Sequence, residues 1–307
     1  MSLKPLLSLA RCFGQRLAVK FHETSPINPL MAHRSFRNSH NSTGTGAVSN
    51  GKLNGRVAII TGSTDGIGFA VAKRMAEDGA KVVISSRKQH NVDKALGELK
   101  DKFPNQVAGI VCHVGKEDDQ QKLIDHTLDQ FGSIDILVSN VAVNPYFGNI
   151  IDMQESQWDK IFEVNVKSPF MLTKKIVPHM LKNNNKSGEN GAIVYISSIA
   201  AYSGMAGLGA YSISKTALLG LCKNMSAELA HEGIRVNLVA PGVIKTKFSN
   251  VLWENENDNE YFKSLTHLKR LGESHELGGI VSFLCSSDAS YITGENFVVA
   301  GGFHCNL

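Results

Sequence analysis

Short apolar runs alternate with longer amphipathic stretches along most of this chain. Seven runs are almost continuously apolar and bounded by polar residues, glycine or proline, which is the pattern of buried strands; they are 57–60, 81–85, 107–114, 134–139, 192–197, 234–240 and 296–300. Longer patterns of helical period lie between them. Buried strands that alternate with helices predict an α/β fold in a single domain, with a doubly wound parallel sheet of about seven strands and helices on both faces.

A glycine-rich segment follows the first apolar run directly and precedes a helical pattern. It reads Thr-Gly-Ser-Thr-Asp-Gly-Ile-Gly over residues 61–68. A glycine turn at a helix N-terminus presents backbone N–H groups and a positive dipole end to a pyrophosphate. We expect Gly62 to permit the tight turn, Gly66 to let the backbone approach the phosphates, and Gly68 to allow close packing of the helix. The segment predicts a dinucleotide cradle, and a flexible surface turn is the alternative.

A tyrosine and a lysine four residues apart form the second chemical feature. On a helix, Tyr211 and Lys215 share one face. The lysine ammonium would favour the phenolate and so lower the tyrosine pKa from its usual value of about 10. Ser198, thirteen residues before Tyr211, supplies a hydroxyl that can hold a carbonyl oxygen. Together the three residues predict proton transfer at a carbonyl, whereas a Tyr–Lys pair alone also fits a solvated helix face.

Composition and charge limit the classes of partner. The chain has 307 residues, 42% of them hydrophobic and 20% charged, which suits one large catalytic domain over residues 51–307 after a leader over 1–50. No apolar run approaches the roughly 20 residues of a membrane span. The formal net charge is +4, but residues 1–50 carry six bases and one acid, which leaves 26 bases and 27 acids elsewhere. We therefore expect a small-molecule substrate, no nucleic acid and no membrane span.

Both ends of the chain carry possible targeting signals. The base-rich, acid-poor leader over residues 1–50 predicts mitochondrial import, with an ordinary disordered tail as the alternative. The last three residues, Cys305-Asn306-Leu307, are similar to a peroxisomal tripeptide of the Ser-Lys-Leu type, although Asn306 lacks the middle base. A peroxisomal or cytoplasmic location therefore stays open.

The cysteines indicate a reducing environment. Five are scattered without a C-x-x-C pair, at Cys12, Cys112, Cys222, Cys285 and Cys305. We expect reduced thiols, no disulfide framework and no metal site.

Five separated motifs, in this order along the chain, resemble those of the short-chain dehydrogenase/reductases. They are Thr61-Gly62-x-x-x-Gly66-x-Gly68, Asn165, Ser198, the Tyr211–Lys215 pair, and Pro241-Gly242-Val243-Ile244-Lys245-Thr246. The resemblance covers about residues 55–302 and implies a Rossmann-like fold. Local agreement, as in Ser85-Ser86-Arg87-Lys88-Gln89, is similar to a branch of NADPH-dependent carbonyl and retinal reductases.

The end of the second predicted strand indicates NADP(H) as the cofactor. NAD enzymes usually carry an acid there, whereas this chain has Ser86 and Arg87, and a guanidinium can pair with a 2′-phosphate. A solvated basic turn is the alternative. Asp65 departs from the pattern, because some NADP-binding relatives carry a base at that place. By resemblance the coenzyme site also includes Gly62, Ser63, Thr64, Gly66, Ile67, Gly68, His113, Val114, Asn140, Tyr211, Lys215, Pro241, Gly242, Ile244 and Thr246.

The resemblance also implies a mechanism. Hydride passes from the nicotinamide to a carbonyl carbon, Tyr211 delivers a proton to the developing alkoxide, and Ser198 donates a hydrogen bond to it. Lys215 lowers the Tyr211 pKa and binds the nicotinamide ribose. Asn165 opens a helix backbone to hold a water for proton relay, or it simply caps or kinks that helix. Tyr202 and Ser197 are second choices for the tyrosine and serine.

The expected substrates are apolar or aromatic ketones, aldehydes such as retinal, and dicarbonyls, with the reverse reaction as an alcohol dehydrogenase. Aromatic residues expected in the substrate loop are Phe147, Phe248, Trp253, Tyr261 and Phe262. A hydroxysteroid or 3-oxoacyl-thioester reductase, and a catalytically silent NADP-binding protein, are the alternatives. The resemblance further implies a homotetramer.

Overall fold

In the computed structural model, residues 51–183 and 190–303 are described, and they contain one seven-stranded parallel sheet. The strands are β1 (Val57–Ile60), β2 (Lys81–Ser86), β3 (Val107–Val111), β4 (Ile136–Ser139), β5 (Gly191–Ile196), β6 (Ile234–Pro241) and β7 (Asn296–Val299). The prediction of all seven strands is confirmed. Only β3 is clearly shorter than expected, because the chain turns after it, with the Lys116 N–H donating to the His113 carbonyl over 2.8 Å.

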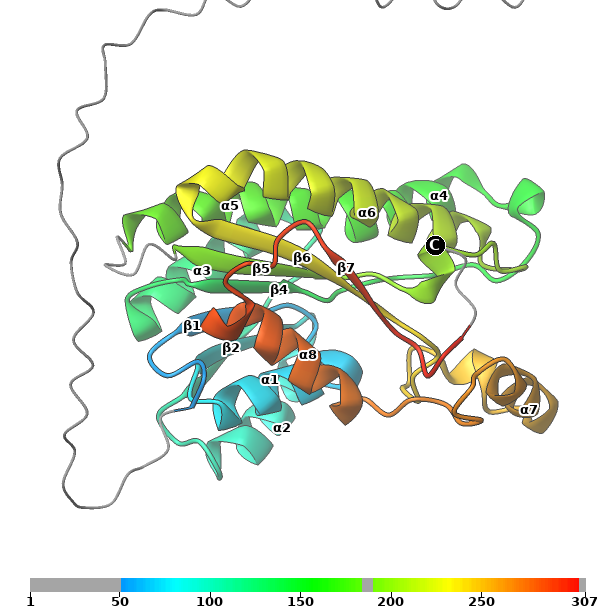
Figure 1. Cartoon of the computed structure of the whole chain (residues 1–307), viewed down its shortest axis with the longest axis horizontal. Coiled ribbons are helices and arrows are strands. Elements are labelled where there is room, and N and C mark those ends of the chain that lie inside the picture. The colour runs from blue at the N-terminus through cyan, green and yellow to red at the C-terminus, as the bar shows by residue number, and fades with distance from the viewer. Residues whose placement is uncertain (1–50, 184–189, 304–307) are drawn as a thin grey trace, which may run out of the picture. The chain divides into compact units, whose positions relative to one another are not determined.

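Helices cover both faces of the sheet (Figure 1). One face carries α1 (Gly66–Glu77), α2 (Gln89–Lys100) and α8 (His275–Cys285), and the other carries α3 (Glu117–Phe131), α5 (Ser168–Lys182) and α6 (Gly209–Leu229). The shorter helices are α4 (Glu155–Phe162) and α7 (Glu256–Ser264). Single 3₁₀ turns lie at 150–152, 199–201, 230–232, 250–252 and 287–289. In the described part of the chain, no helix has both the length and the apolar character needed to cross a membrane.

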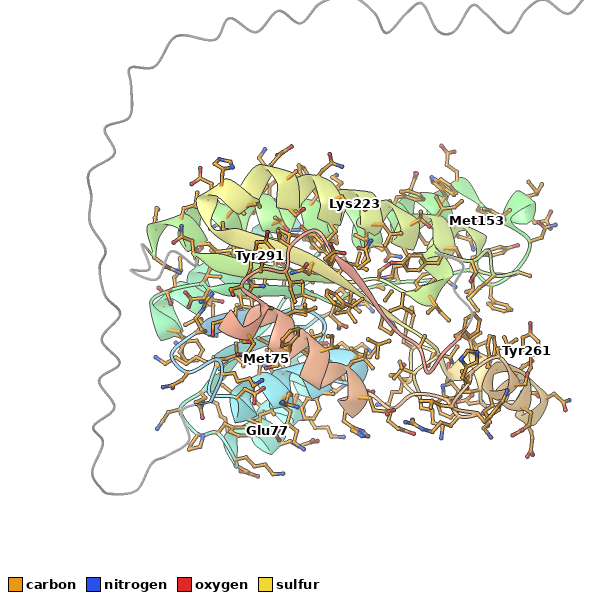
Figure 2. All side chains as sticks on the ribbon, viewed as in Figure 1. Met75, Glu77, Met153, Lys223, Tyr261 and Tyr291 are labelled. Carbon is orange, nitrogen blue, oxygen red and sulfur yellow. The ribbon has the colours of Figure 1, made fainter. Side chains whose placement is uncertain are left out.

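Two apolar clusters, one on each face, explain why the strands are apolar throughout. All four residues of β1 are buried, since Ala58 and Ile60 face one cluster while Ile59 faces the other. Met75 of α1 packs in the first cluster (Figure 2), and Leu218 of α6 packs in the second. A strand buried on both faces cannot alternate apolar with polar residues, so continuous apolar runs are the expected pattern.

The strand order, β3-β2-β1-β4-β5-β6-β7, reverses direction at the centre of the sheet. β1 pairs with both β2 and β4, and Ile60 at its end lies opposite Val138. After β1 and after β4, which are neighbours, the chain continues to opposite faces of the sheet. This opens a crevice at their carboxyl ends, where such folds bind ligands. The described residues form a single doubly wound, Rossmann-like domain, as expected.

The segment between β6 and α8 makes a long excursion that carries α7, seen at the lower right of Figure 1. Its two ends are joined by a parallel bridge between Ile244 and Gly272. The Lys245 N–H donates to the Gly272 carbonyl over 2.9 Å, and the Gly272 N–H donates to the Val243 carbonyl over 3.0 Å. This stem fixes where the excursion leaves and rejoins the sheet.

Candidate active site

A cavity of about 800 Å³ lies at the carboxyl ends of the strands. Its walls come from the segments that follow β1 to β6, so residues far apart in the sequence meet there. It collects most of the predicted residues, namely Gly62, Thr64, Gly66, Ile67, Ser86, Arg87, His113, Val114, Asn140, Ser198, Tyr211, Lys215, Pro241, Gly242, Ile244 and Thr246. Ser63, Gly68 and Asn165 do not border it.

The glycine turn has the backbone geometry that its sequence predicts. Gly62 and Gly66 have φ of 59° and 57°, in the left-handed region that favours glycine. A Cβ on Gly68 would overlap the Gly62 carbonyl oxygen and the Asn140 side chain, so α1 can pack this closely only with glycine there. The Asn140 Nδ2 donates to the carbonyls of Thr61, over 3.1 Å, and Gly62, over 2.9 Å, which ties the turn to the segment after β4.

The Ser63 hydroxyl stabilises the glycine turn from the side that faces the protein interior. Its fully buried hydroxyl donates to the Ile60 carbonyl over 2.6 Å and accepts from the Ser85 N–H over 3.0 Å. The hydroxyl therefore joins β1 to β2 and faces away from the cavity. Ser63 and Gly68, which were predicted to bind the coenzyme, do not line the cavity and instead stabilise the glycine turn through contacts in the protein interior.

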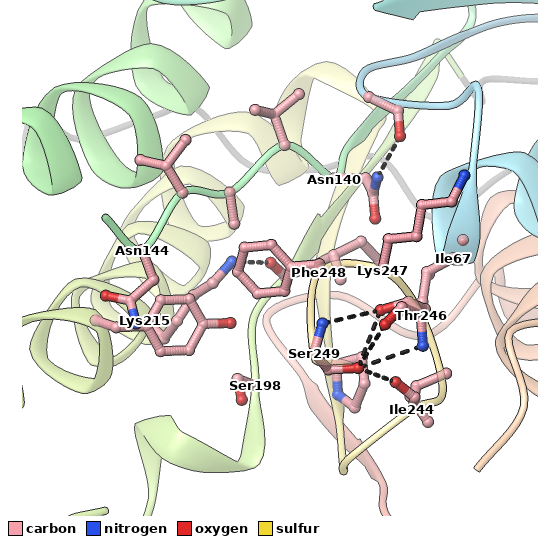
Figure 3. A pocket seen from close by; sticks show the side chains of 18 of the residues that line it. Ile67, Asn140, Asn144, Ser198, Lys215, Ile244, Thr246, Lys247, Phe248 and Ser249 are labelled. Carbon is pink, nitrogen blue, oxygen red and sulfur yellow. Dashed lines mark hydrogen bonds between the residues drawn. The ribbon is translucent and has the colours of Figure 1, made fainter. Parts of the chain in front are cut away.

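Tyr211 and Lys215 lie on one face of α6 and line the cavity, and Figure 3 shows Lys215 and Ser198 beside it. Tyr211 is 8% exposed and Lys215 is 2% exposed. The Lys215 Nζ lies 5.7 Å from the centroid of the Tyr211 ring. Ser198 lines the same cavity and its side chain lowers the pKa of Tyr211, so the hydroxyl, the phenol and the amine lie around one place.

Burial decides the protonation of this pair. It raises the pKa of Tyr211 to about 12, against the smaller lowering effect of the Ser198 hydrogen bond. It also lowers the pKa of Lys215 to about 7. The expectation that Lys215 lowers the pKa of Tyr211 is therefore wrong for this structure, because loss of water around the phenolate raises that pKa and burial also lowers the charge of Lys215 at neutral pH. The phenol keeps its proton at neutral pH and can act as a donor.

Asn165 lies behind the cavity, in a π-helical turn over 163–167 that joins α4 to α5. Its buried side chain accepts from the Val143 N–H over 2.8 Å and donates to the Val143 carbonyl and the Ser214 Oγ, each over 3.0 Å. It therefore ties the segment after β4 to α6. The π turn widens the helix backbone locally, a feature often found at functional sites.

The end of β2 presents a cation to the cavity. Ser86 is the last residue of the strand, and Arg87 after it is exposed. Among the described residues, no ion pair or side-chain hydrogen bond engages the Arg87 guanidinium. Asp65 is the only acidic residue among the described residues that line the cavity.

The segment after β6 is organised around one hydroxyl that sequence reasoning missed (Figure 3). The Ser249 Oγ donates to the Ile244 carbonyl, contacts the Thr246 Oγ1 at 3.1 Å, and accepts from the Trp253 indole over 3.1 Å. Ser249 thereby holds Thr246 against the cavity. Thr246 and Ser249 are three residues apart after a strand, a spacing typical of local side-chain hydrogen bonds. This spacing is the feature of the sequence that could have indicated the role of Ser249.

Two of the five aromatic residues expected in the substrate loop line the cavity. Phe147 and Phe248 do, and the Phe248 ring centroid lies 6.0 Å from that of Tyr211. Trp253, Tyr261 and Phe262 do not line it, and Tyr261 lies on α7, away from the sheet (Figure 2). The structure does not place these three at the cavity, because the Trp253 indole bonds to Ser249 and the other two lie on α7. Other lining residues that the sequence did not single out are Asn144, Met205, Leu208, Val251 and Leu252.

The second-choice residues have other partners. The Ser197 hydroxyl donates to the Lys215 carbonyl over 2.9 Å and so supports the backbone of α6. Tyr202 packs against the second apolar cluster and does not line the cavity. Among the cysteines within the described residues, Cys112, Cys222 and Cys285 are free and buried, as expected, whereas Cys12 and Cys305 lie outside those residues.

Comparison with known proteins identifies close relatives. A family model described as enoyl-(acyl carrier protein) reductase matches residues 62–304. Dehydrogenase/reductase SDR family member 4 of Bos taurus is 53% identical over 84% of this chain and 90% of its own length. The human member 4 is 51% identical over 86% and 93%, and human SDR family member 2, named mitochondrial, is 50% identical over 88% and 94%.

Solved structures agree with this grouping. One, of a putative gluconate dehydrogenase from Agrobacterium tumefaciens, has a TM-score of 0.77 with 28% identity and covers 83% of this chain and 98% of that one. Another, of 3-ketoacyl-(acyl-carrier-protein) reductase from Brucella melitensis complexed with NADH, has a TM-score of 0.76 with 31% identity and covers 81% and 98%. The family model and the close relatives show that the chain belongs to the short-chain dehydrogenase/reductase (SDR) family, whose members are oxidoreductases that bind a nicotinamide coenzyme.

Proposed function

We propose that the protein is an NADPH-dependent carbonyl reductase that acts on apolar or aromatic ketones, retinal-like aldehydes or dicarbonyls, and runs in reverse as an alcohol dehydrogenase. The observation that carries this proposal is the meeting of Ser198, Tyr211 and Lys215 in a cavity that also borders the glycine turn. A silent NADP-binding protein would not need to keep a buried phenol and amine together, because burying them is costly.

The bound coenzyme would supply hydride to the carbonyl carbon. The Ser198 hydroxyl donates a hydrogen bond to the carbonyl oxygen, and Tyr211 delivers its proton to the alkoxide as charge develops there. Because the alkoxide exists only along the reaction, these donors stabilise the transition state more than the bound substrate. With its pKa raised to about 12, the Tyr211 phenol is a proton donor at neutral pH.

Lys215 and Asn165 assist the reaction without contacting the carbonyl group. The Lys215 amine would hold the nicotinamide ribose hydroxyls and, when protonated, would pass a proton on to the Tyr211 phenolate after the reduction. Asn165 fixes α6 against the segment after β4 and, through the π turn, opens the backbone where a water could relay protons. Both residues are positioned by bonds to backbone carbonyls, to Ile196 and Val143 respectively.

The choice of NADPH depends on the residues after β2. Ser86 and Arg87 would read the 2′-phosphate, and the absence of an acid at the end of β2, within the described chain, removes the usual preference for NADH. Gly62, Thr64, Gly66 and Ile67 would hold the pyrophosphate. His113, Val114, Asn140, Pro241, Gly242, Ile244 and Thr246 would line the rest of the coenzyme.

The substrate class follows from an apolar part of the cavity lining. Phe147, Phe248, Met205, Leu208 and Leu252 give it an apolar wall, which suits a hydrophobic carbonyl compound better than a charged sugar. A 3-oxoacyl thioester is a second candidate, since the Brucella melitensis neighbour is a 3-ketoacyl reductase.

Assembly and location complete the proposal. By analogy with the family, we propose a homotetramer of catalytic domains over residues 51–307. The leader over 1–50 supports a mitochondrial location, in line with the mitochondrial name of human member 2. Peroxisomal targeting by Cys305-Asn306-Leu307, or a cytoplasmic location, is the alternative. Both signals lie outside the described residues.

Initial rates of the full-length protein test the function. We would measure NADPH and NADH oxidation with retinal, an α-dicarbonyl, an aromatic ketone and a 3-oxoacyl thioester. The proposal expects turnover of the first three, with NADPH preferred. Turnover of the thioester alone would replace the proposed substrate class, and no turnover despite NADPH binding would favour a silent protein.

A further inference from the structure

An acidic side chain caps the helix at which the pyrophosphate is expected. Asp65 is the N-cap of α1, and its Oδ1 accepts a hydrogen bond from the Gly66 N–H over 2.8 Å. Helix N-termini favour anions through their free N–H groups and dipole. A carboxylate at this position occupies one of these N–H groups and repels an incoming phosphate. The cradle therefore contains a charge that opposes its ligand.

A lysine from the segment after β6 neutralises this charge. The Lys247 Nζ lies 2.6 Å from the Asp65 Oδ2, although the two residues are 182 positions apart. Both line the cavity, and both side chains are largely exposed, at 88% and 59%. The hydrogen bond to Lys247 lowers the pKa of Asp65, while the same bond raises the pKa of Lys247. Both groups are therefore charged at neutral pH.

The position of Lys247 is set by the segment that carries it. Thr246, directly before it, is held by Ser249, and its Cγ2 would lie 3.2 Å from a Cβ placed on Gly66. The segment after β6 thus already touches the glycine turn. Lys245 is in the same segment and pairs with Glu273 at 3.5 Å, but it does not line the cavity.

We propose that Lys247 is a determinant of coenzyme affinity that acts by neutralising Asp65, so that the α1 N-terminus can accept the pyrophosphate. The inference rests on the proposed function, because it assumes a dinucleotide at the glycine turn. Lys247 is a positioning residue in this account: it removes a repulsion instead of contacting the reacting atoms. The effect is electrostatic, so salt weakens it, as the Debye length falls from about 10 Å at 0.1 M salt to about 3 Å at 1 M.

The test is a fluorescence titration of the full-length protein with NADPH. For Lys247→Gln at 0.1 M salt we expect the Kd to rise about three- to fivefold, the size of one exposed charge interaction. Asp65→Asn keeps the capping oxygen and loses the charge, so its Kd should equal or fall below that of the parent. The double variant should return to within about twofold of the parent, and at 1 M salt all these ratios should approach one.

Lys245→Gln is the matched control, because it removes the same charge from the same segment and should leave the Kd unchanged. Circular dichroism checks that each variant is folded. An unchanged Kd in Lys247→Gln would overturn the inference, and so would a double variant as weak as Lys247→Gln, since Lys247 would then act on the coenzyme directly. If the parent protein does not bind NADPH at all, the proposed function fails together with this inference.

Discussion

The Lys215 Nζ donates a hydrogen bond to the Ile196 carbonyl over 2.8 Å at the end of β5, which anchors the amine between the sheet and the Tyr211 ring. The bond fixes the amine whether or not it carries a charge. It does not replace the water that the ammonium loses on burial, and the pKa of Lys215 is accordingly lowered to about 7.

A lysine buried in this way should weaken the fold in a pH-dependent manner. Its pKa is about 10.5 when unfolded and about 7 when folded, so between these values the unfolded state binds more protons and stability rises with pH. Lys215→Met removes the ionisable group and with it this pH-dependent loss of stability. We expect the variant to be more stable than the parent by on the order of 3 kcal/mol at pH 6, with the gap shrinking toward pH 10. Urea unfolding of both proteins at pH 6, 8 and 10 measures the difference in their free energies of unfolding. A difference that does not change with pH would refute the lowered pKa of Lys215.

Arg87 should determine the choice of coenzyme. Arg87→Gln removes a charge-assisted contact to a 2′-phosphate, and such contacts contribute about 1.5 to 3 kcal/mol. We expect the KM for NADPH to rise about tenfold or more, while the KM for NADH stays the same. Lys88→Gln is the control, because Lys88 follows Arg87 but does not line the cavity. Equal effects on the two coenzymes would remove Arg87 from phosphate recognition.

Asn165 should matter for stability as well as for activity. Asn165→Ala leaves the half-buried Val143 N–H and carbonyl, and the buried Ser214 hydroxyl, without their partner, which should lower the free energy of unfolding by about 2 to 4 kcal/mol. Urea unfolding at pH 7 measures the loss. Asn224→Ala is the comparison, since among residues 51–183 and 190–303 this exposed amide on α6 bonds to Gly220 of its own helix alone, and its loss should change little. Similar losses in the two variants would contradict the anchoring role.

Ser249 should control the environment of Trp253. In a Trp158→Phe background Trp253 is the only tryptophan, because the chain has two, so selective tryptophan excitation reports on it alone. Ser249→Ala removes the acceptor of its indole N–H, so we expect a shifted emission maximum and stronger acrylamide quenching. Ser264→Ala, which removes an exposed hydroxyl on α7, should leave the emission unchanged. An unchanged spectrum in Ser249→Ala would show that the segment does not depend on this hydroxyl.

The strands and most site residues were predictable because each depends on a short stretch of sequence. β1 is buried on both faces, so its four consecutive apolar residues predict a strand. Gly62, two residues after β1, has a positive φ that glycine adopts easily. Tyr211 and Lys215 share a helix face through their spacing alone. Residues at the carboxyl ends of parallel strands then meet without further information.

Features that depend on tertiary contact were not predictable. Nothing near Ser63 in the sequence shows that its hydroxyl turns inward to Ser85. The partner of Asp65 is 182 positions away, on a segment whose path is set by the stem at Ile244. The pKa of Tyr211 depends on how completely the surrounding elements exclude water, which spacing cannot reveal, and this is why its shift is opposite to the one expected.

In the proposed reaction, the Tyr211 phenol delivers the proton that completes carbonyl reduction. Steady-state kinetics of Tyr211→Phe with NADPH and an aromatic ketone tests it most directly, with NADPH titration as the control for coenzyme binding. We expect kcat to fall by about 10²- to 10⁴-fold, or about 3 to 5 kcal/mol of barrier, with the NADPH Kd unchanged. A Tyr211→Phe variant that reduces the ketone as fast as the parent would contradict it.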